Sequence, residues 1–204
     1  MILNNKILIY FVNNLHMEIY KYMKRTVIIS IIILLTIAAY SQTTASYSTT
    51  DGVKWYTIQE AENMLKKAPR PLFIDTYTDW CGWCKKMDKE TFSNKVVADI
   101  LNNKFYPVKF NAEGKESITF LGQKFINDGK AGNAHQLAVA LLRGQLFYPT
   151  VVFLIPENNE YAISQAKGFR EAKDMEVLLS FFAEQAYKTQ KLEDFQKSFK
   201  GNVR

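Results

Sequence analysis

The chain has 204 residues, of which 48% are hydrophobic and 14% aromatic. This length and composition allow one domain with a buried core and exclude disorder as the main state. The formal net charge is +6, but four basic residues and one acidic residue lie in the first 41 positions. The remaining 22 basic and 19 acidic residues give +3 without a clustered basic patch, so nucleic-acid binding is not expected.

Residues 1–41 are predicted to be a signal peptide. A basic pair precedes an almost uninterrupted apolar run from Val27 to Tyr40, which is shorter than the roughly 20 residues of a membrane span. Small residues before Gln42 predict cleavage there, and Met23 is the start expected for a signal of ordinary length. The alternative is an uncleaved leader that anchors the protein in the membrane.

The first regular elements are predicted beyond a Ser- and Thr-rich lead-in at 42–54. Thr57 and Glu60 fit a capping box, and apolar residues then recur at helical spacing, which predicts a helix over 58–67. Residues 71–77 begin with a continuous apolar run, which is typical of a strand covered by helices on both faces.

A second strand is predicted at 105–111, after two helical stretches. The first stretch runs through Glu90. The second is expected to be capped by Ser93 and to carry an apolar stripe, formed by Val96, Val97, Ile100 and Leu101. The resulting helix-strand-helix-strand order predicts two parallel strands joined by a crossover helix.

An insertion is expected at 113–132, with a hairpin around Gly122, followed by a helix over 134–142 that His135 precedes or caps. Residues 151–155 form the most hydrophobic predicted strand, and a turn at 156–159 would return it as an antiparallel strand.

The C-terminal part carries the apolar stripe of a helix that packs on the sheet, with Met175, Leu178, Leu179, Phe182, Ala183 and Ala186 at helical spacing. Leu192, Phe195 and Phe199 are expected to prolong this helix. Phe169 and the pair Phe181 and Phe182 are expected in the core. The order of elements predicts an α/β fold in which helices cover both faces of a mixed central sheet.

Cys81 and Cys84 are the only cysteines, and they stand where the first predicted strand gives way to a helix. The first thiol then lies at a helix N-terminus, where unpaired backbone N–H groups and the helix dipole favour its thiolate. A reactive dithiol is therefore predicted. The alternatives are an inert disulfide, which would close only a small loop, and a zinc site, for which only His16 and His135 would be left as partners.

The segment Trp80-Cys81-Gly82-Trp83-Cys84-Lys85 closely resembles the active-site motif of the thioredoxin superfamily. The resemblance implies a thioredoxin fold over 55–188, with an extra N-terminal helix, the insertion before a cis-proline strand and a C-terminal helical tail at 189–204. It also implies thiol-disulfide exchange with protein thiols and disulfides as substrates. No metal or other cofactor is expected, because the cysteine pair is itself the redox carrier.

Further residues take roles from the same resemblance. Asp75, six residues before Cys81, corresponds to a buried aspartate that helps to deprotonate the second cysteine, and Lys109 to the lysine beside it. Tyr148-Pro149 resembles the cis-proline loop that faces the dithiol, and Gly168 the glycine after the last strand. From the residues alone, Asp75 remains open as a capping or surface carboxylate, Lys109 as a solvent-facing lysine, and Pro149 as an ordinary trans turn proline.

Trp80, Gly82 and Trp83 are expected to contribute the surface that a substrate chain contacts, with burial of both indoles in the core as the alternative. Gly82-Trp83 stands where ordinary thioredoxins carry Gly-Pro, which leaves the direction of electron flow open.

The predicted function is that of an exported, periplasmic or extracytoplasmic, monomeric thiol:disulfide oxidoreductase of the reductase type. Its electrons would come from a membrane-embedded thiol reductase. The alternatives are a disulfide-donating oxidase and a redox-sensitive chaperone or binding module.

Overall fold

A computed structural model describes residues 23–24, 52–157 and 160–203. The predicted signal peptide and its cleavage site before Gln42 lie outside these residues, apart from Met23 and Lys24. Within the described ranges, no helix combines the length and the apolar composition that a membrane crossing requires.

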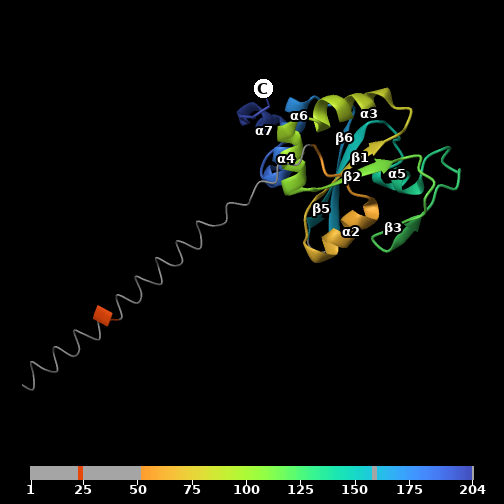
Figure 1. Ribbon diagram of the computed structural model, residues 1–204, viewed down its shortest axis with the longest axis horizontal. Coiled ribbons are helices and arrows are strands. Elements are labelled where there is room, and N and C mark those ends of the chain that lie inside the picture. The colour runs from red at the N-terminus through yellow and green to blue at the C-terminus, as the bar shows by residue number, and fades with distance from the viewer. Residues whose placement is uncertain (1–22, 25–51, 158–159, 204) are drawn as a thin grey trace, which may run out of the picture. The chain divides into compact units, whose positions relative to one another are not determined.

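Four strands form one mixed sheet in the order β2-β1-β5-β6 (Figure 1). Strand β1 (Leu72–Tyr77) runs parallel to β2 (Tyr106–Asn111) and antiparallel to β5 (Thr150–Glu157). Strand β6 (Glu160–Lys167) pairs antiparallel with β5 at the other edge. The parallel crossover and the antiparallel hairpin are both as predicted.

Successive strand residues point to opposite sides of the sheet. Apolar strand residues lie on both sides, and helices cover both faces. Leu72 and Ile74 of β1 point into a core shared with α2 (Ile58–Lys67) and α5 (Gln136–Leu141). Phe73 points the other way, into the core beneath two longer helices, α4 (Lys95–Lys104) and α6 (Ala172–Ala183). Figure 1 shows these two groups of helices on opposite sides of the sheet. Together with the helix that precedes β1, this arrangement is the thioredoxin fold.

Helix α2 begins with the predicted capping box. The Thr57 hydroxyl accepts the Glu60 N–H at 3.2 Å, and the Glu60 carboxylate accepts the Thr57 N–H at 2.8 Å. These two bonds satisfy donors that the first helical turn leaves without partners.

Beyond the cysteines the chain forms α3 (Gly82–Met87) and then a π-helical segment, η1 (Asp88–Phe92). The prediction that Ser93 caps the next helix was wrong. Asn94 has the extended backbone of a cap, and its Oδ1 accepts N–H groups of the first turn of α4 at 3.0 and 3.4 Å. Ser93 is still in helical conformation, and its hydroxyl donates to the Lys89 carbonyl at 2.5 Å.

The predicted insertion contains a two-stranded hairpin, β3 (Ile118–Phe120) and β4 (Gln123–Phe125). Its two turn residues, Leu121 and Gly122, have φ values of 50° and 78°. This left-handed pair is the geometry of a tight hairpin turn, so the hairpin prediction is confirmed.

The prediction of a turn over 156–159 was wrong for its first half. Pro156 and Glu157 belong to β5 and pair with Tyr161 and Glu160. Strand β1 pairs with β5 only as far as Leu154, so a proline at position 156 removes no hydrogen bond from that side of β5.

The last helix is not prolonged into the tail as predicted. Gln185 takes a left-handed conformation with φ 57°, which ends α6 and leads into a short 3-10 turn, η2 (Ala186–Lys188). A separate helix, α7 (Leu192–Ser198), then packs against α6 and buries Phe195 in the same core.

Residues 52–54, assigned to a flexible lead-in, are bound to the domain. The Gly52 carbonyl accepts Asn102 Nδ2 at 3.0 Å, and the Lys54 N–H donates to Asn102 Oδ1 at 2.8 Å. Tyr56 then pairs with Val108 in a parallel bridge beside β2. The lead-in prediction was therefore wrong for these three residues.

Candidate active site

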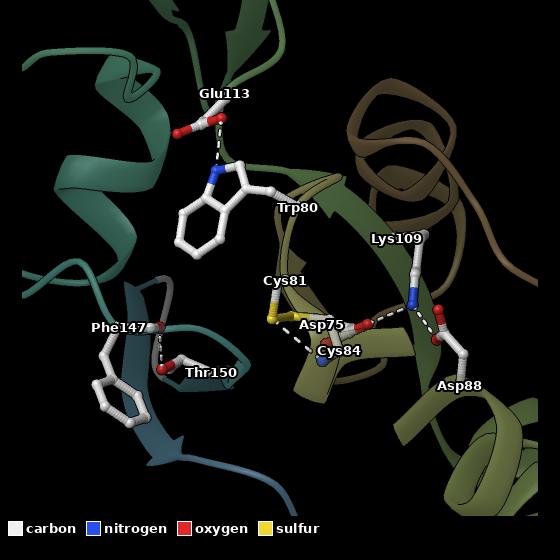
Figure 2. The surroundings of a disulfide bond; sticks show 9 residues. All are labelled: Asp75, Trp80, Cys81, Cys84, Asp88, Lys109, Glu113, Phe147 and Thr150. Carbon is white, nitrogen blue, oxygen red and sulfur yellow. Dashed lines mark hydrogen bonds and ion pairs between the residues drawn. A yellow bond between two sulfur atoms is a disulfide. The ribbon is translucent and has the colours of Figure 1, made fainter. Parts of the chain in front are cut away.

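The two cysteines form a disulfide at the start of α3 (Figure 2). Cys81 caps the helix, and its sulfur accepts the Cys84 backbone N–H at 3.1 Å. In the reduced protein the same N–H would face a Cys81 thiolate and stabilise it, together with the helix dipole. Cys81 is 4% exposed and Cys84 1%, so Cys81 is the sulfur that a partner reaches more readily.

Asp75 lies near the end of β1 on the same face as Phe73, toward α3, α4 and α6. It is 0% exposed. Burial raises the pKa of its carboxyl group to about 6, against the opposing attraction of Lys109. The alternative of a surface or capping carboxylate is therefore wrong.

Lys109 reaches Asp75 because the parallel register sets these residues opposite each other on β1 and β2. Its Nζ donates to Asp75 Oδ2 at 2.6 Å and also pairs with Asp88. Three rings surround the ammonium at 5.0 to 5.4 Å, those of Tyr77, Trp55 and Phe92. Burial alone would lower the pKa of Lys109, but the two carboxylates outweigh it and the pKa is raised. Lys109 thus stays cationic and does not simply project into solvent.

The other carboxylate oxygen of Asp75, Oδ1, is buried and accepts no hydrogen bond from the described residues. A buried carboxylate oxygen without a partner is unfavourable, and binding a proton relieves the cost. Figure 2 shows the Lys109 ammonium between the carboxylates of Asp75 and Asp88, with a dashed line to each. The Asp75 carboxyl group is suited to take up and release a proton near neutral pH.

The loop that precedes β5 contains the predicted cis peptide bond, between Tyr148 and Pro149. Two hydrogen bonds hold this loop. Thr150 Oγ1 donates to the Phe147 carbonyl at 2.7 Å, and the Gly168 N–H donates to the Pro149 carbonyl at 2.8 Å. Gly168 has φ 86°, which a residue with a side chain rarely adopts.

Aromatic side chains surround the disulfide. Trp80 is 66% exposed, Trp83 58% and Phe147 53%, so the alternative that the two tryptophans are core residues is wrong. Trp80 meets Tyr148 edge-on at 6.0 Å between ring centroids. Trp83 packs against Phe169 at 5.5 Å, so Phe169 is only partly a core residue.

Among the other predicted positions, Gly82 begins α3, and a Cβ added there would meet open space. His135 caps α5, where its Nδ1 accepts the Leu137 N–H at 3.0 Å. Phe181 and Phe182 are buried in the core, as predicted. In the part of the chain that the structure describes, His, Cys, Asp and Glu form no group of three suited to a metal ion.

Sequence reasoning missed three residues around the site: Asp88, Glu113 and Phe147. Asp88 lies seven residues after Cys81, two helical turns along, and pairs with Lys109 from a different element. Glu113 accepts a hydrogen bond from Trp80, a contact that only the fold creates. The signal that could have identified Phe147 is its position directly before Tyr148 in the predicted cis-proline loop.

Comparison with known proteins decides the family. The family Thioredox_DsbH, described as "Protein of unknown function, DUF255", matches residues 38–198. The chain belongs to this family. Its DsbH-type thioredoxin domain agrees with the fold and with the position of the cysteine pair.

Curated relatives are much longer than this chain. Thiol:disulfide interchange protein DsbD of Pectobacterium atrosepticum is 29% identical over 126 residues, which are 62% of this chain and 19% of DsbD. Spermatogenesis-associated protein 20 of Mus musculus is 27% identical over 107 residues, 52% of this chain and 14% of that protein. The chain therefore spans about a fifth or less of these two relatives.

Two of the solved structures that resemble the chain illustrate the shared fold. One is titled "DsbH Oxidoreductase", with 17% identity, a TM-score of 0.48 and coverage of 73% of this chain and 93% of that one. The other is a thioredoxin from Thermus thermophilus, with 17% identity, a TM-score of 0.48 and coverage of 74% and 99%. The family match and the disulfide at the start of α3 place the chain among thioredoxin-like proteins that carry a Cys-x-x-Cys pair, Cys81 and Cys84.

Proposed function

We propose that this DsbH-type protein is an exported protein-disulfide reductase. The observation that carries the proposal is the position of the dithiol. The Cys81 sulfur lies at the start of α3, where it accepts the Cys84 N–H, and a buried carboxyl group with a pKa of about 6 stands at the end of the adjoining strand. In the reduced protein this arrangement would supply a stabilised thiolate and, on the strand that leads to the dithiol, a buried proton acceptor.

The proposed reaction begins with attack of the Cys81 thiolate on one sulfur of a partner disulfide. A Cys81–partner disulfide forms, and the partner's other sulfur leaves as a thiolate that takes a proton from water. Cys84 then passes its proton to Asp75 and attacks the Cys81 sulfur. The partner's remaining sulfur leaves as a thiolate that takes a proton from water, Asp75 returns its proton to the solvent, and two electrons have moved from the cysteine pair to the partner. The protein is left with the Cys81–Cys84 disulfide seen in the structure.

Lys109 is proposed to support the proton transfer. Its ammonium holds Asp75 Oδ2, which leaves Oδ1 as the oxygen that accepts the proton. Pro149 and the exposed aromatic side chains are proposed to receive the partner chain beside Cys81, because a proline offers no N–H to compete for the sulfur.

A cycling reductase needs a source of electrons. We propose that a membrane-embedded dithiol reduces the Cys81–Cys84 disulfide on the extracytoplasmic side, as the similarity to a thiol:disulfide interchange protein suggests. No metal or organic cofactor enters this scheme, since both half-reactions are thiol-disulfide exchanges. Export and a monomeric state belong to the same proposal.

The proposal can be tested with Cys84→Ser and Cys81→Ser in the reduction of a disulfide-linked peptide by the protein and excess dithiothreitol. The wild-type protein should turn over. In a second reaction without dithiothreitol, which would cleave the adduct, pre-reduced Cys84→Ser should accumulate a covalent adduct with the peptide, detectable by mass spectrometry, and pre-reduced Cys81→Ser should form none. Equal adduct formation by both variants would contradict the assigned order of the two sulfurs, and no turnover by the wild-type protein would contradict a reductase.

A further inference from the structure

We propose that Glu113 is a positioning residue for substrate binding and that the insertion at 113–132 holds it in place. The proposed task of Glu113 is to fix the indole of Trp80 as one wall of the surface that receives the partner chain. This inference rests on the proposed exchange with protein disulfides.

Trp80 directly precedes Cys81, and 66% of its surface is exposed. Its Nε1–H donates to Glu113 Oε2 at 3.0 Å, and its ring edge meets Tyr148 of the cis-proline loop at 6.0 Å. Figure 2 shows the indole lying between the Glu113 carboxylate and the disulfide region. An exposed tryptophan without such contacts would sample several rotamers, so these two contacts select one orientation.

Glu113 is itself held by the segment in which it lies. Its backbone N–H donates to Asn111 Oδ1 at 3.0 Å, and its carbonyl accepts Asn127 Nδ2 at 3.3 Å. Asn111 also donates through Nδ2 to Asp79 Oδ2 at 3.0 Å. Of the two residues before Cys81, Asp79 is therefore tied to the last residue of β2 and Trp80 to the first residue of the insertion.

Asn127 closes the base of the insertion. Besides Glu113, its Nδ2 contacts the carbonyls of Gly114 at 3.1 Å and Asn133 at 2.6 Å, so one side chain joins the two ends of the inserted segment. A buried ring adds a second brace, since His135 Nε2 lies 2.9 Å from the Glu116 carbonyl. These bonds explain how a segment on the surface can present a carboxylate at a defined place.

Because the Trp80 indole is already oriented in the free protein, binding of the partner chain loses less side-chain entropy. The saving arises on binding and is equal in the bound state and the transition state, so it should alter KM far more than kcat. Chemistry at Cys81 and Cys84 does not require the Trp80–Glu113 bond in this scheme.

The test compares Glu113→Ala, Glu113→Gln and Lys124→Ala in the full chain, with a disulfide-linked, fluorescence-quenched peptide as substrate. Lys124 lies in the same insertion, on the exposed strand β4, and is the matched control. Glu113→Ala should raise KM about fivefold, the effect of losing one ordinary hydrogen bond, with kcat changed less than about twofold. Glu113→Gln keeps an oxygen that can accept the indole N–H, so it should restore KM to nearly the wild-type value, and Lys124→Ala should not differ from wild type.

The Trp80 indole N–H provides a readout that a general loss of stability would not move. Its resonance in ¹⁵N NMR spectra should exchange with solvent faster in Glu113→Ala than in the wild type, Glu113→Gln or Lys124→Ala. An unchanged KM and unchanged exchange in Glu113→Ala, beside an active wild type, would overturn the positioning role alone. A wild-type protein that reduces no peptide would overturn the proposed function and the positioning role with it.

Discussion

Asp75 and Glu176 are both 0% exposed, yet their surroundings differ. Glu176, on α6, accepts three hydrogen bonds from the C-terminal segment: from the N–H and Nδ2 of Asn202 at 2.6 and 3.2 Å, and from the Val203 N–H at 2.9 Å. Asp75 has one oxygen on Lys109 and one buried oxygen without a partner among the described residues. Burial alone therefore does not indicate function in this chain.

The difference lies in what each carboxylate can still do. Both oxygens of Glu176 accept hydrogen bonds, so this carboxylate links α6 to residues 202–203. Asp75 keeps an oxygen free to bind a proton and has a pKa near 6. Asp75→Asn and Glu176→Gln are matched changes of a buried carboxylate to its amide. The effect of Asp75→Asn on the free energy of unfolding should depend on pH near neutrality, and Glu176→Gln should lower the free energy of unfolding.

The largest expected effect is on the pH dependence of stability. The Asp75 pKa is raised from 3.8 to about 6, so between these values the native state holds a proton that the unfolded state has lost. Stability from this group is complete below about pH 4 and is lost as the pH rises through about 6. Relative to Asp75→Asn, the wild-type free energy of unfolding should fall by about 3 kcal/mol from about pH 4 to pH 7.5.

Urea unfolding of both proteins with the disulfide intact, at a series of pH values, measures this difference. A constant gap between wild type and Asp75→Asn across the range would mean that burial does not raise the pKa of Asp75. Glu176→Gln serves as the reference variant, since it leaves Asp75 and Lys109 unchanged.

The second effect is kinetic. Asp75→Asn should slow the attack of Cys84 on the mixed disulfide by about 10²-fold at neutral pH, because the general base is removed. The deficit should shrink above about pH 8.5, where a cysteine ionises without help. Stopped-flow tryptophan fluorescence can follow release of the peptide, and a deficit of equal size at every pH would argue against a role in proton transfer.

Glu176→Gln should destabilise the protein by about 2 kcal/mol, because an amide NH₂ would replace one of two oxygens that accept N–H groups. The rate of peptide reduction by the folded protein should stay at the wild-type value. Chemical denaturation and the peptide assay measure the two quantities. A lower rate of peptide reduction with an unchanged free energy of unfolding would contradict this purely structural role of Glu176.

The smallest effect is expected for the exposed ion pair Lys86–Glu90, 3.7 Å apart, with 43% and 51% of the side chains exposed. Glu90→Gln should change stability by less than about 0.5 kcal/mol, since solvent and salt screen such pairs. Denaturation at low and high salt would check this. A salt-dependent loss of stability well above about 0.5 kcal/mol in Glu90→Gln would show that the Glu90 charge has stabilising interactions besides its pair with Lys86.

Much of the fold was predictable because local signals and tertiary packing agree. Thr57 and Glu60 marked the start of α2, and the apolar stripe from Met175 to Phe182 marked α6. The predictions that were wrong concern residues whose local chemistry permits two outcomes. Ser93 and Asn94 can both cap a helix, and nothing in the local pattern showed that Gln185 would take a left-handed conformation and end α6.

At the site, the local motif predicted the cysteine pair, and the resemblance suggested the cis bond before Pro149 and the pairing of Asp75 with Lys109. The partners from distant parts of the chain were not predictable in the same way. Glu113 meets Trp80 across 33 residues, and Asp88 meets Lys109 across 21. Such contacts depend on the strand register and on the path of the insertion, which no local pattern specifies.

The reduction potential of the purified protein tests the central claim most directly. The protein would be equilibrated in graded dithiol/disulfide buffers at pH 7, with its redox state followed by the fluorescence of Trp80 and Trp83. A reductase supplied with electrons from the membrane should have a potential near the roughly −270 mV of thioredoxin. A value near the roughly −120 mV of a strong oxidant would contradict this account and make the protein a disulfide donor.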